Sequence, residues 1–168
     1  MPQRKTIERA RRDKSEGKAP TTQAGEFVRE EIEHIREGKH GARSAAQAVA
    51  IGLSKARRAG VDLPPPKQGE APEATRRSAQ RALNAGEKSN AKVSPKPSRA
   101  VTTALRREGQ AAASQTALSR QARAAAGERS ATERSAAAQR AARTKGPAER
   151  SEAAQKAART RARHKAGG

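Results

Sequence analysis

Large apolar residues follow a helical spacing in the first third of the chain. Ala24, Phe27 or Val28, Ile32 and Ile35 recur at steps of three and four residues, which places them on one face of a helix. Charged residues fill most of the positions between them. The pattern therefore predicts an amphipathic helix with one side turned toward a core.

The ends of two helices can be predicted from residues that cap or stop a helix. Thr22 can cap the first helix with its hydroxyl group, and Gly38 ends it. Ser44 is a suitable cap for the second helix, which runs to Ala59 and ends at Gly60. Because only a short loop with glycines separates the two helices, we expect them to pack as an αα-hairpin.

The predicted hairpin offers only a small core. A charged helix over residues 6–16 precedes it, and Val61 and Leu63 can fold back over it. A core of this size is marginal below about 70 residues. We therefore expect the module to be weakly stable alone or to need a partner. The apolar stripe of the second helix consists of Ala45, Val49, Leu53 and Ala56.

The rest of the chain has a different pattern. Residues 67–168 contain five large apolar residues, and nothing apolar larger than alanine follows Leu118. Residues 131–146 and 147–162 repeat one another at a spacing of sixteen residues, with mostly conservative differences. Gly146-Pro147 lies between the two copies and predicts two short helices joined by a hinge, because glycine suits a helix end and proline a first turn.

These patterns together predict an all-α fold in two parts. Residues 1–66 form a small basic helical module of two or three short helices. Residues 67–168 form a long tail, rich in alanine and arginine, that is disordered or transiently helical because it has no apolar face to bury. Pro64-Pro65-Pro66 marks the boundary, since stacked prolines cannot continue a helix and favour a stiff connection.

Composition restricts the class of protein. Apolar residues make up 33% of the chain, but 39 of these residues are alanine, which buries little area. Cysteine is absent, which excludes disulfides and thiolate chemistry. No stretch approaches the ~20 apolar residues that span a bilayer, and no secretory signal is visible. We therefore expect a cytoplasmic protein that does not bind membranes.

The charge of the chain indicates the partner. Lys and Arg number 37 against 17 Asp and Glu, and +15 of the net charge of +20 lies in residues 67–168. Such a charge favours a polyanion. Proteins that bind single strands or RNA loops stack bases on aromatic rings, but Phe27 is the one aromatic residue here. Because phosphate contacts need only Lys and Arg, duplex DNA is favoured over RNA.

Four blocks of the N-terminal part carry a resemblance to a known family. They are Lys5-Thr6-Ile7-Glu8-Arg9-Ala10, Gly25-Glu26-Phe27-Val28-Arg29-Glu30-Glu31, Gly38-Lys39-His40-Gly41-Ala42-Arg43-Ser44 and Ile51-Gly52-Leu53-Ser54-Lys55-Ala56-Arg57-Arg58-Ala59-Gly60. In this order they resemble a family of short basic bacterial proteins, classed as a domain of unknown function and loosely labelled DNA-binding. The resemblance covers residues 5–66 and implies a bacterial origin. The tail is similar in composition to the tails of histone H1-like bacterial proteins.

The loop between the two hairpin helices is the first candidate binding site. It lies at a helix N-terminus, where N–H groups and the helix dipole favour an anion. Lys39, His40 and Arg43 would add positive charge and form a phosphate clamp. The alternative is an ordinary capped turn with solvated charges. The spacing of the glycines is not that of a P-loop.

Further candidates lie at the end of the hairpin and along the tail. Lys55, Arg57 and Arg58 either bind nucleic acid or complement the dipole at a helix C-terminus. Sequence-specific reading by a helix-turn-helix is disfavoured, because the exposed face of that helix is mostly alanine. In the tail, a narrow basic stripe is formed by Lys156, Arg159 and Arg163, and the other candidates are Arg134, Arg140, Arg143, Arg150 and Arg161.

The sequence contains no recognisable catalytic or metal-binding pattern. His34, His40 and His164 have no ligand spacing, whereas zinc needs three or four ligands, so we expect solvated histidines, no metal and no cofactor. The carboxylates are not paired, and no serine lies in a nucleophile motif. We therefore expect neither enzymatic activity nor a small-molecule substrate.

The sequence favours a nucleoid-associated or histone H1-like protein that binds DNA non-specifically through phosphate contacts. In this interpretation the helical module anchors or dimerises, while the tail neutralises phosphates and gains helix on binding. Two alternatives stay open. In one, the helices of residues 22–60 bind a protein partner or a second copy, and the tail only solubilises or localises the protein. In the other, the protein associates with RNA or the ribosome.

Overall fold

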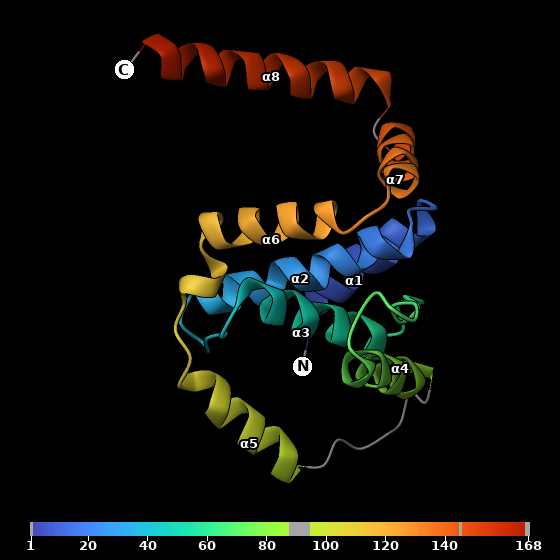
Figure 1. Cartoon of the computed structure of the whole chain (residues 1–168), viewed down its shortest axis with the longest axis vertical. Helices are drawn as coiled ribbons and strands as arrows, with labels where there is room; N and C mark the ends of the chain where they lie inside the picture. The colour runs from blue at the N-terminus through green and yellow to red at the C-terminus, as the bar shows by residue number, and fades with distance from the viewer. Residues whose placement is uncertain (1, 88–94, 145, 167–168) are drawn as a thin grey trace. The chain divides into compact units, whose positions relative to one another are not determined.

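The structure is a computed structural model that describes residues 2–87, 95–144 and 146–166. Within these ranges no strand occurs, and the helices confirm the predicted all-α class (Figure 1). The chain divides into two compact units, residues 1–122 and 123–168. The elements are α1 (Arg4–Ser15), α2 (Pro20–Arg36), α3 (Ala45–Arg58), α4 (Glu73–Glu87), α5 (Pro95–Arg106), the 3-10 helix η1 (Ala111–Ala113), α6 (Gln115–Gly127), α7 (Ala131–Thr144) and α8 (Pro147–Ala166).

The helical hairpin of α2 and α3 lies at the centre of the first unit. Gly52 and Ala56 on α3 are buried, and a Cβ atom added to Gly52 would lie 2.6 Å from Cα of Val28 on α2. The two helices therefore approach so closely that the contact accepts only a residue without a side chain. The predicted apolar stripe of α3 is confirmed in part: Ala45 and Ala56 are buried, whereas Val49 and Leu53 are half-buried.

The predicted helix ends are confirmed with one exception. Ser44 caps α3, since its Oγ accepts a backbone N–H of the first turn at 3.2 Å. Gly38 and Gly60 follow α2 and α3 with φ angles of +73° and +87°, a conformation that favours glycine. Thr22 is not a cap, because α2 begins earlier, at Pro20, whose fixed φ suits a first helical turn.

Two small clusters form the core of the first unit, and both draw on distant parts of the chain. Val61 and Leu63 fold back onto the hairpin as predicted. Two alanines of η1 pack into the other cluster, so the chain itself covers part of the surface for which a partner was expected. The first cluster is Ala10, Ala24, Phe27, Ala56, Val61 and Leu63, and the second is Ile32, Ile35, Ala42, Ala48, Ala112 and Ala113.

The predicted disordered tail is wrong for the segment that directly follows the prolines. α4 packs against α3 and buries two alanines, and the compact unit extends to residue 122. The prolines connect these helices: Arg57 donates to the carbonyl oxygen of Pro64 at 3.1 Å, and Arg76 to that of Pro66 at 3.2 Å. Alanine contributes to this core because its small side chain lets two helices approach closely. A high alanine content by itself does not show whether such a close contact forms.

The second unit contains α7 and α8, which are helical where the sequence predicted disorder or transient helix. α7 ends at Thr144 and α8 begins at Pro147, so the predicted break between the repeats is confirmed. Ser130 and Glu133 form a capping box at the start of α7, with hydrogen bonds of 2.9 and 3.2 Å. Every described side chain of both helices is exposed or half-buried. Helix propensity and caps therefore maintain these helices.

No helix within the described ranges combines the length and apolar character that crossing a membrane requires. α8 is the longest of them, with 20 residues, but it is rich in arginine and lysine.

Candidate nucleic-acid interface

The backbone of the predicted phosphate-clamp loop is occupied by other parts of the first unit. The N–H group of Gly41 donates to the carbonyl oxygen of Leu105 at 2.8 Å, and that of Ala42 donates to Gly109 at 3.1 Å. A Cβ atom on Gly41 would lie 1.9 Å from a carbonyl oxygen of the same segment. The glycine therefore allows the close approach of residues 105–109, and these two N–H groups are not directed at an incoming phosphate.

Two side chains of this loop remain at the surface. Lys39 Nζ lies 2.7 Å from a carboxylate oxygen of Glu37, and Arg43 Nε lies 3.7 Å from Glu108. The hydrogen bond and the charge of Lys39 lower the pKa of Glu37. The side chain of Arg43 is 80% exposed. Because exposed ion pairs are weak, Lys39 and Arg43 can still contact a phosphate, but as two surface cations rather than as a clamp.

His40 and Lys55 point to a buried carboxylate instead of the surface. Glu31 on α2 is fully buried; Lys55 binds its Oε2, and His40 Nε2 lies 3.3 Å from its Oε1. His34 lies one turn farther along α2, with its ring centroid 6.3 Å from that of His40. The structure therefore brings together two predicted site residues with two others that the sequence analysis did not select, Glu31 and His34.

The expectation that the histidines are solvated is wrong for His34 and His40. Their side chains are 14% and 16% exposed, and one ligand atom from each of them and from Glu31 lies within 4.8 Å of the others. Burial lowers the pKa of His34, and the charges of two nearby lysines act in the same direction. The available signal was the three-residue spacing of Glu31 and His34 on one helix face. The side chain of His164 lies outside the described residues.

The end of α3 separates the two neighbouring arginines. Arg57 is 6% exposed, and its guanidinium donates to the carbonyl oxygens of Leu63, at 2.9 Å, and Pro64. Burial also lowers its pKa. Arg58 is exposed. Arg57 therefore holds the chain that leaves α3 and is not available to a phosphate, whereas Arg58 is accessible and complements the dipole at the helix end.

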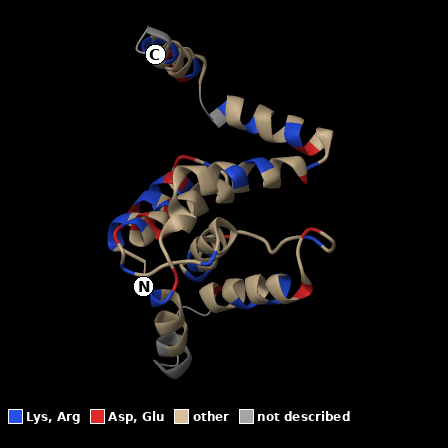
Figure 2. Cartoon of the chain, turned by 60° about the vertical axis from the view of Figure 1, so that its left-hand side comes forward, with Lys and Arg blue, Asp and Glu red and all other residues tan. Residues whose placement is uncertain are grey.

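The predicted basic residues of the tail are all exposed on regular helices. Lys156, Arg159 and Arg163 belong to the uninterrupted helix α8, which places them on one face. Figure 2 shows Lys and Arg in blue along α7 and α8. The exposed set contains every tail candidate of the sequence analysis: Arg134, Arg140, Arg143, Arg150, Lys156, Arg159, Arg161 and Arg163.

Comparisons with protein-family models, with curated proteins and with solved structures find no match to this chain. The resemblance of residues 5–66 to short basic bacterial proteins therefore stays a prediction. The candidate interface is argued from its own residues and their surroundings.

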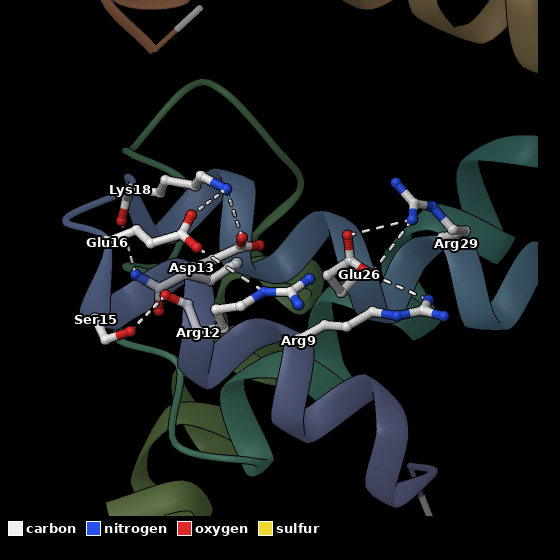
Figure 3. A network of polar contacts seen from close by, with 9 residues as sticks. Arg9, Arg12, Asp13, Ser15, Glu16, Lys18, Glu26 and Arg29 are labelled. Atoms are coloured by element: carbon white, nitrogen blue, oxygen red, sulfur yellow. Dashed lines mark hydrogen bonds and ion pairs between the residues drawn. The ribbon is translucent and has the colours of Figure 1, made fainter.

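Charged residues in the first unit contact one another across helices (Figure 3). Lys18 Nζ lies 2.9 Å from the buried carboxylate of Asp13. Arg9 on α1 and Arg29 on α2 each lie 3.4 Å from Glu26. These contacts engage part of the positive charge of the first unit within the fold. On α7 and α8, by contrast, every described Lys and Arg side chain is exposed.

Proposed function

We propose that the protein binds nucleic acid non-specifically through the phosphate backbone, with duplex DNA as the main partner. The observation that carries this proposal is the exposure of the basic side chains on α7 and α8, two helices that bury no face. Residues 123–168 contain 12 Lys and Arg against 4 Glu. Contacts between such side chains and phosphates fix a protein on the duplex but do not read its sequence.

The α8 helix offers the best-defined contact. Lys156, Arg159 and Arg163 share one face and can follow a row of phosphates. The matching face of α7 has only Arg140 and Arg143. The break between the helices lets each of them present its own basic residues, which a continuous helix would direct to nearly opposite sides.

The preference for duplex DNA rests on the single aromatic residue. Phe27 is 1% exposed in the core of the first unit. It therefore offers no ring on which a base could stack, which is how most proteins hold single strands. In this proposal the first unit adds the exposed charges of Lys39, Arg43 and Arg58.

The proposal is tested on the full chain with duplex DNA of mixed sequence, by fluorescence anisotropy. The variant Lys156→Gln/Arg159→Gln/Arg163→Gln is compared with Arg4→Gln/Lys5→Gln/Arg11→Gln, which removes the same charge from exposed positions of α1. We expect the α8 variant to weaken binding at least tenfold more than the α1 variant. Equal losses, or tighter binding of single-stranded RNA than of duplex DNA, would contradict the proposal.

A further inference from the structure

The buried carboxylate of Glu31 has one oxygen that the protein leaves without a donor. Lys55 binds Oε2, but among the described residues no group hydrogen-bonds Oε1. His40 Nε2 lies 3.3 Å away, at the distance of an ion pair but without the geometry of a hydrogen bond. An unsatisfied charged atom in a fully buried position is costly. This oxygen therefore needs a hydrogen-bond donor or a cation.

The orientation of His40 also indicates that a group is needed between its ring and Oε1 of Glu31. Its Nδ1 lies 3.1 Å from the carbonyl oxygen of Gly41 and can donate a hydrogen bond to it. In the neutral ring, Nε2 then carries a lone pair that faces Oε1 of Glu31. Two acceptors at 3.3 Å repel one another, and either a proton on Nε2 or a metal ion beside both atoms removes the repulsion. A backbone carbonyl that holds the second ring nitrogen is also the usual support of a histidine that binds a metal.

His34 supplies a third group on the same side. It follows Glu31 by three residues on α2, so the two side chains share a helix face. The side-chain amide nitrogen of Gln3 lies 3.0 Å from Nε2 of His34, so a metal that bound this Nε2 would take the place of Gln3. The side chain of His34 is 14% exposed, so it lies beside the buried carboxylate rather than in solvent.

We propose that Glu31, His34 and His40 bind a divalent transition-metal ion, with zinc as the first candidate. Their ligand atoms already lie within 4.8 Å of one another. Zinc bonds of ~2.0–2.2 Å in tetrahedral geometry place ligand atoms about 3.4 Å apart, close to the 3.3 Å between His40 and Glu31. Two imidazoles and one carboxylate suit zinc and leave a fourth position for water.

The surrounding charges are compatible with a cation. Glu30 is 3% exposed, and its carboxylate lies 3.8 Å from His34 Nε2. Glu30 and Glu31 offset the charges of Lys39 and Lys55, the two lysines that act on His34. Lys55 contacts only Oε2, so the oxygen that faces the histidines stays available.

A metal at this site would fasten the loop after α2 to the helix itself. His40 belongs to that loop, and the two neighbouring residues Gly41 and Ala42 hold the segment of residues 105–109 by backbone hydrogen bonds. The ion would therefore stabilise the first unit, including the part of it that lies distant in sequence. This inference is independent of nucleic-acid binding.

The test uses the full chain without a histidine tag, treated with a chelator and then titrated with zinc in a calorimeter. We expect one ion per chain and a Tm that rises with zinc concentration, because the ion binds the folded state. Cobalt in place of zinc should give the visible absorption of a four-coordinate ion. Absence of binding at micromolar zinc would overturn the proposal and leave the cluster as a protonated ion-pair network.

Variants assign the site to its residues. His34→Asn and His40→Asn should each weaken zinc binding at least about tenfold, the lower range seen for loss of even an outer-shell partner. Glu33→Gln, exposed on the same helix, and His164→Asn serve as matched controls and should bind as the unaltered chain does. Circular dichroism shows that each variant is folded. Unchanged affinity in both folded histidine variants would overturn the proposal.

Lys55→Gln separates a metal site from a purely structural cluster. Removal of the ammonium group leaves Glu31 without its present partner and lowers the repulsion of an incoming ion. We expect zinc to raise the Tm of this variant more than that of the unaltered chain. The same or a smaller rise would contradict the proposed role of Glu31 as a ligand.

Discussion

The two units use the same kinds of residues in opposite ways. Ala48 and Ala56 on α3 are fully buried, whereas the alanines of α8 lie at a surface with no neighbouring helix within their unit to cover them. What differs is the presence of Gly52 between the α3 alanines, which lets α2 approach to contact distance. The comparison shows that alanine forms a core only where the sequence also allows two backbones to come close.

Charge follows the same division. In the first unit, carboxylates such as Asp13 and Glu26 lie against basic side chains of neighbouring elements. In the second unit the basic residues line exposed helices and outnumber the acidic ones three to one. We infer that part of the positive charge of the first unit stabilises its own fold through ion pairs, whereas the basic residues of the second unit lie on exposed helices.

Phe27→Ala should give the largest loss in the first unit. This side chain is the largest in the core and is almost fully buried. Removing it should lower the free energy of unfolding by about 3–5 kcal/mol, measured by denaturant titration of the full chain. A loss under about 1 kcal/mol would show that the first unit is not organised around this ring.

Gly52→Ala should give the next largest loss of stability. The added methyl group meets the backbone of α2, so the hairpin must open, at a cost of about 1–3 kcal/mol. Gly25→Ala is the matched control, because nothing lies within 4 Å of a Cβ atom there, and helix propensity should stabilise it by about 0.5–1 kcal/mol. Equal effects of the two substitutions would refute the close contact of α2 and α3.

Arg57→Met should cost about 1–3 kcal/mol, because it leaves the carbonyl oxygens of Leu63 and Pro64 without their donor. Arg58→Met removes the same charge one residue later, at an exposed position, and should change stability by less than about 0.5 kcal/mol. Thermal unfolding of the two variants gives the comparison. If Arg57 were only a surface cation, the two values would agree.

Ala154→Gly should have the smallest effect on cooperative unfolding. The substitution weakens α8 locally by about 1 kcal/mol of helix propensity, but no core depends on it. Far-ultraviolet circular dichroism should lose helix signal without a change in the Tm of the first unit. Ala48→Gly, the same substitution in a fully buried position of α3, should lower that Tm; a shared response would contradict the division into two units.

Local signals in the sequence were sufficient for much of the fold. Ser44, Gly38 and the pair Gly146-Pro147 fix helix ends through their own geometry, and all three predictions are confirmed. The prediction that Thr22 caps α2 is wrong, because the helix begins earlier, at Pro20. The all-α class followed from helix formers and spacing, which are also local.

Contacts between distant segments could not be predicted in this way. The approach of η1 to the hairpin joins residues about seventy positions apart, and no periodic pattern marks it. The same holds for the carboxylate site, because His40 reaches Glu31 only after the chain turns at Gly38. For Arg57, the sequence indicated a basic helix end, but it did not indicate that the side chain is buried and donates to the carbonyl oxygens of Leu63 and Pro64.

The most direct test of the account is the salt dependence of DNA binding by the full chain. The eight exposed tail residues Arg134, Arg140, Arg143, Arg150, Lys156, Arg159, Arg161 and Arg163 are replaced together by glutamine. Each lost phosphate contact should reduce the slope of log affinity against log salt by about 0.9, so the variant should bind weakly and with a much flatter slope, while the first unit keeps its Tm. A variant with the affinity and slope of the unaltered chain would contradict the assignment of binding to α7 and α8.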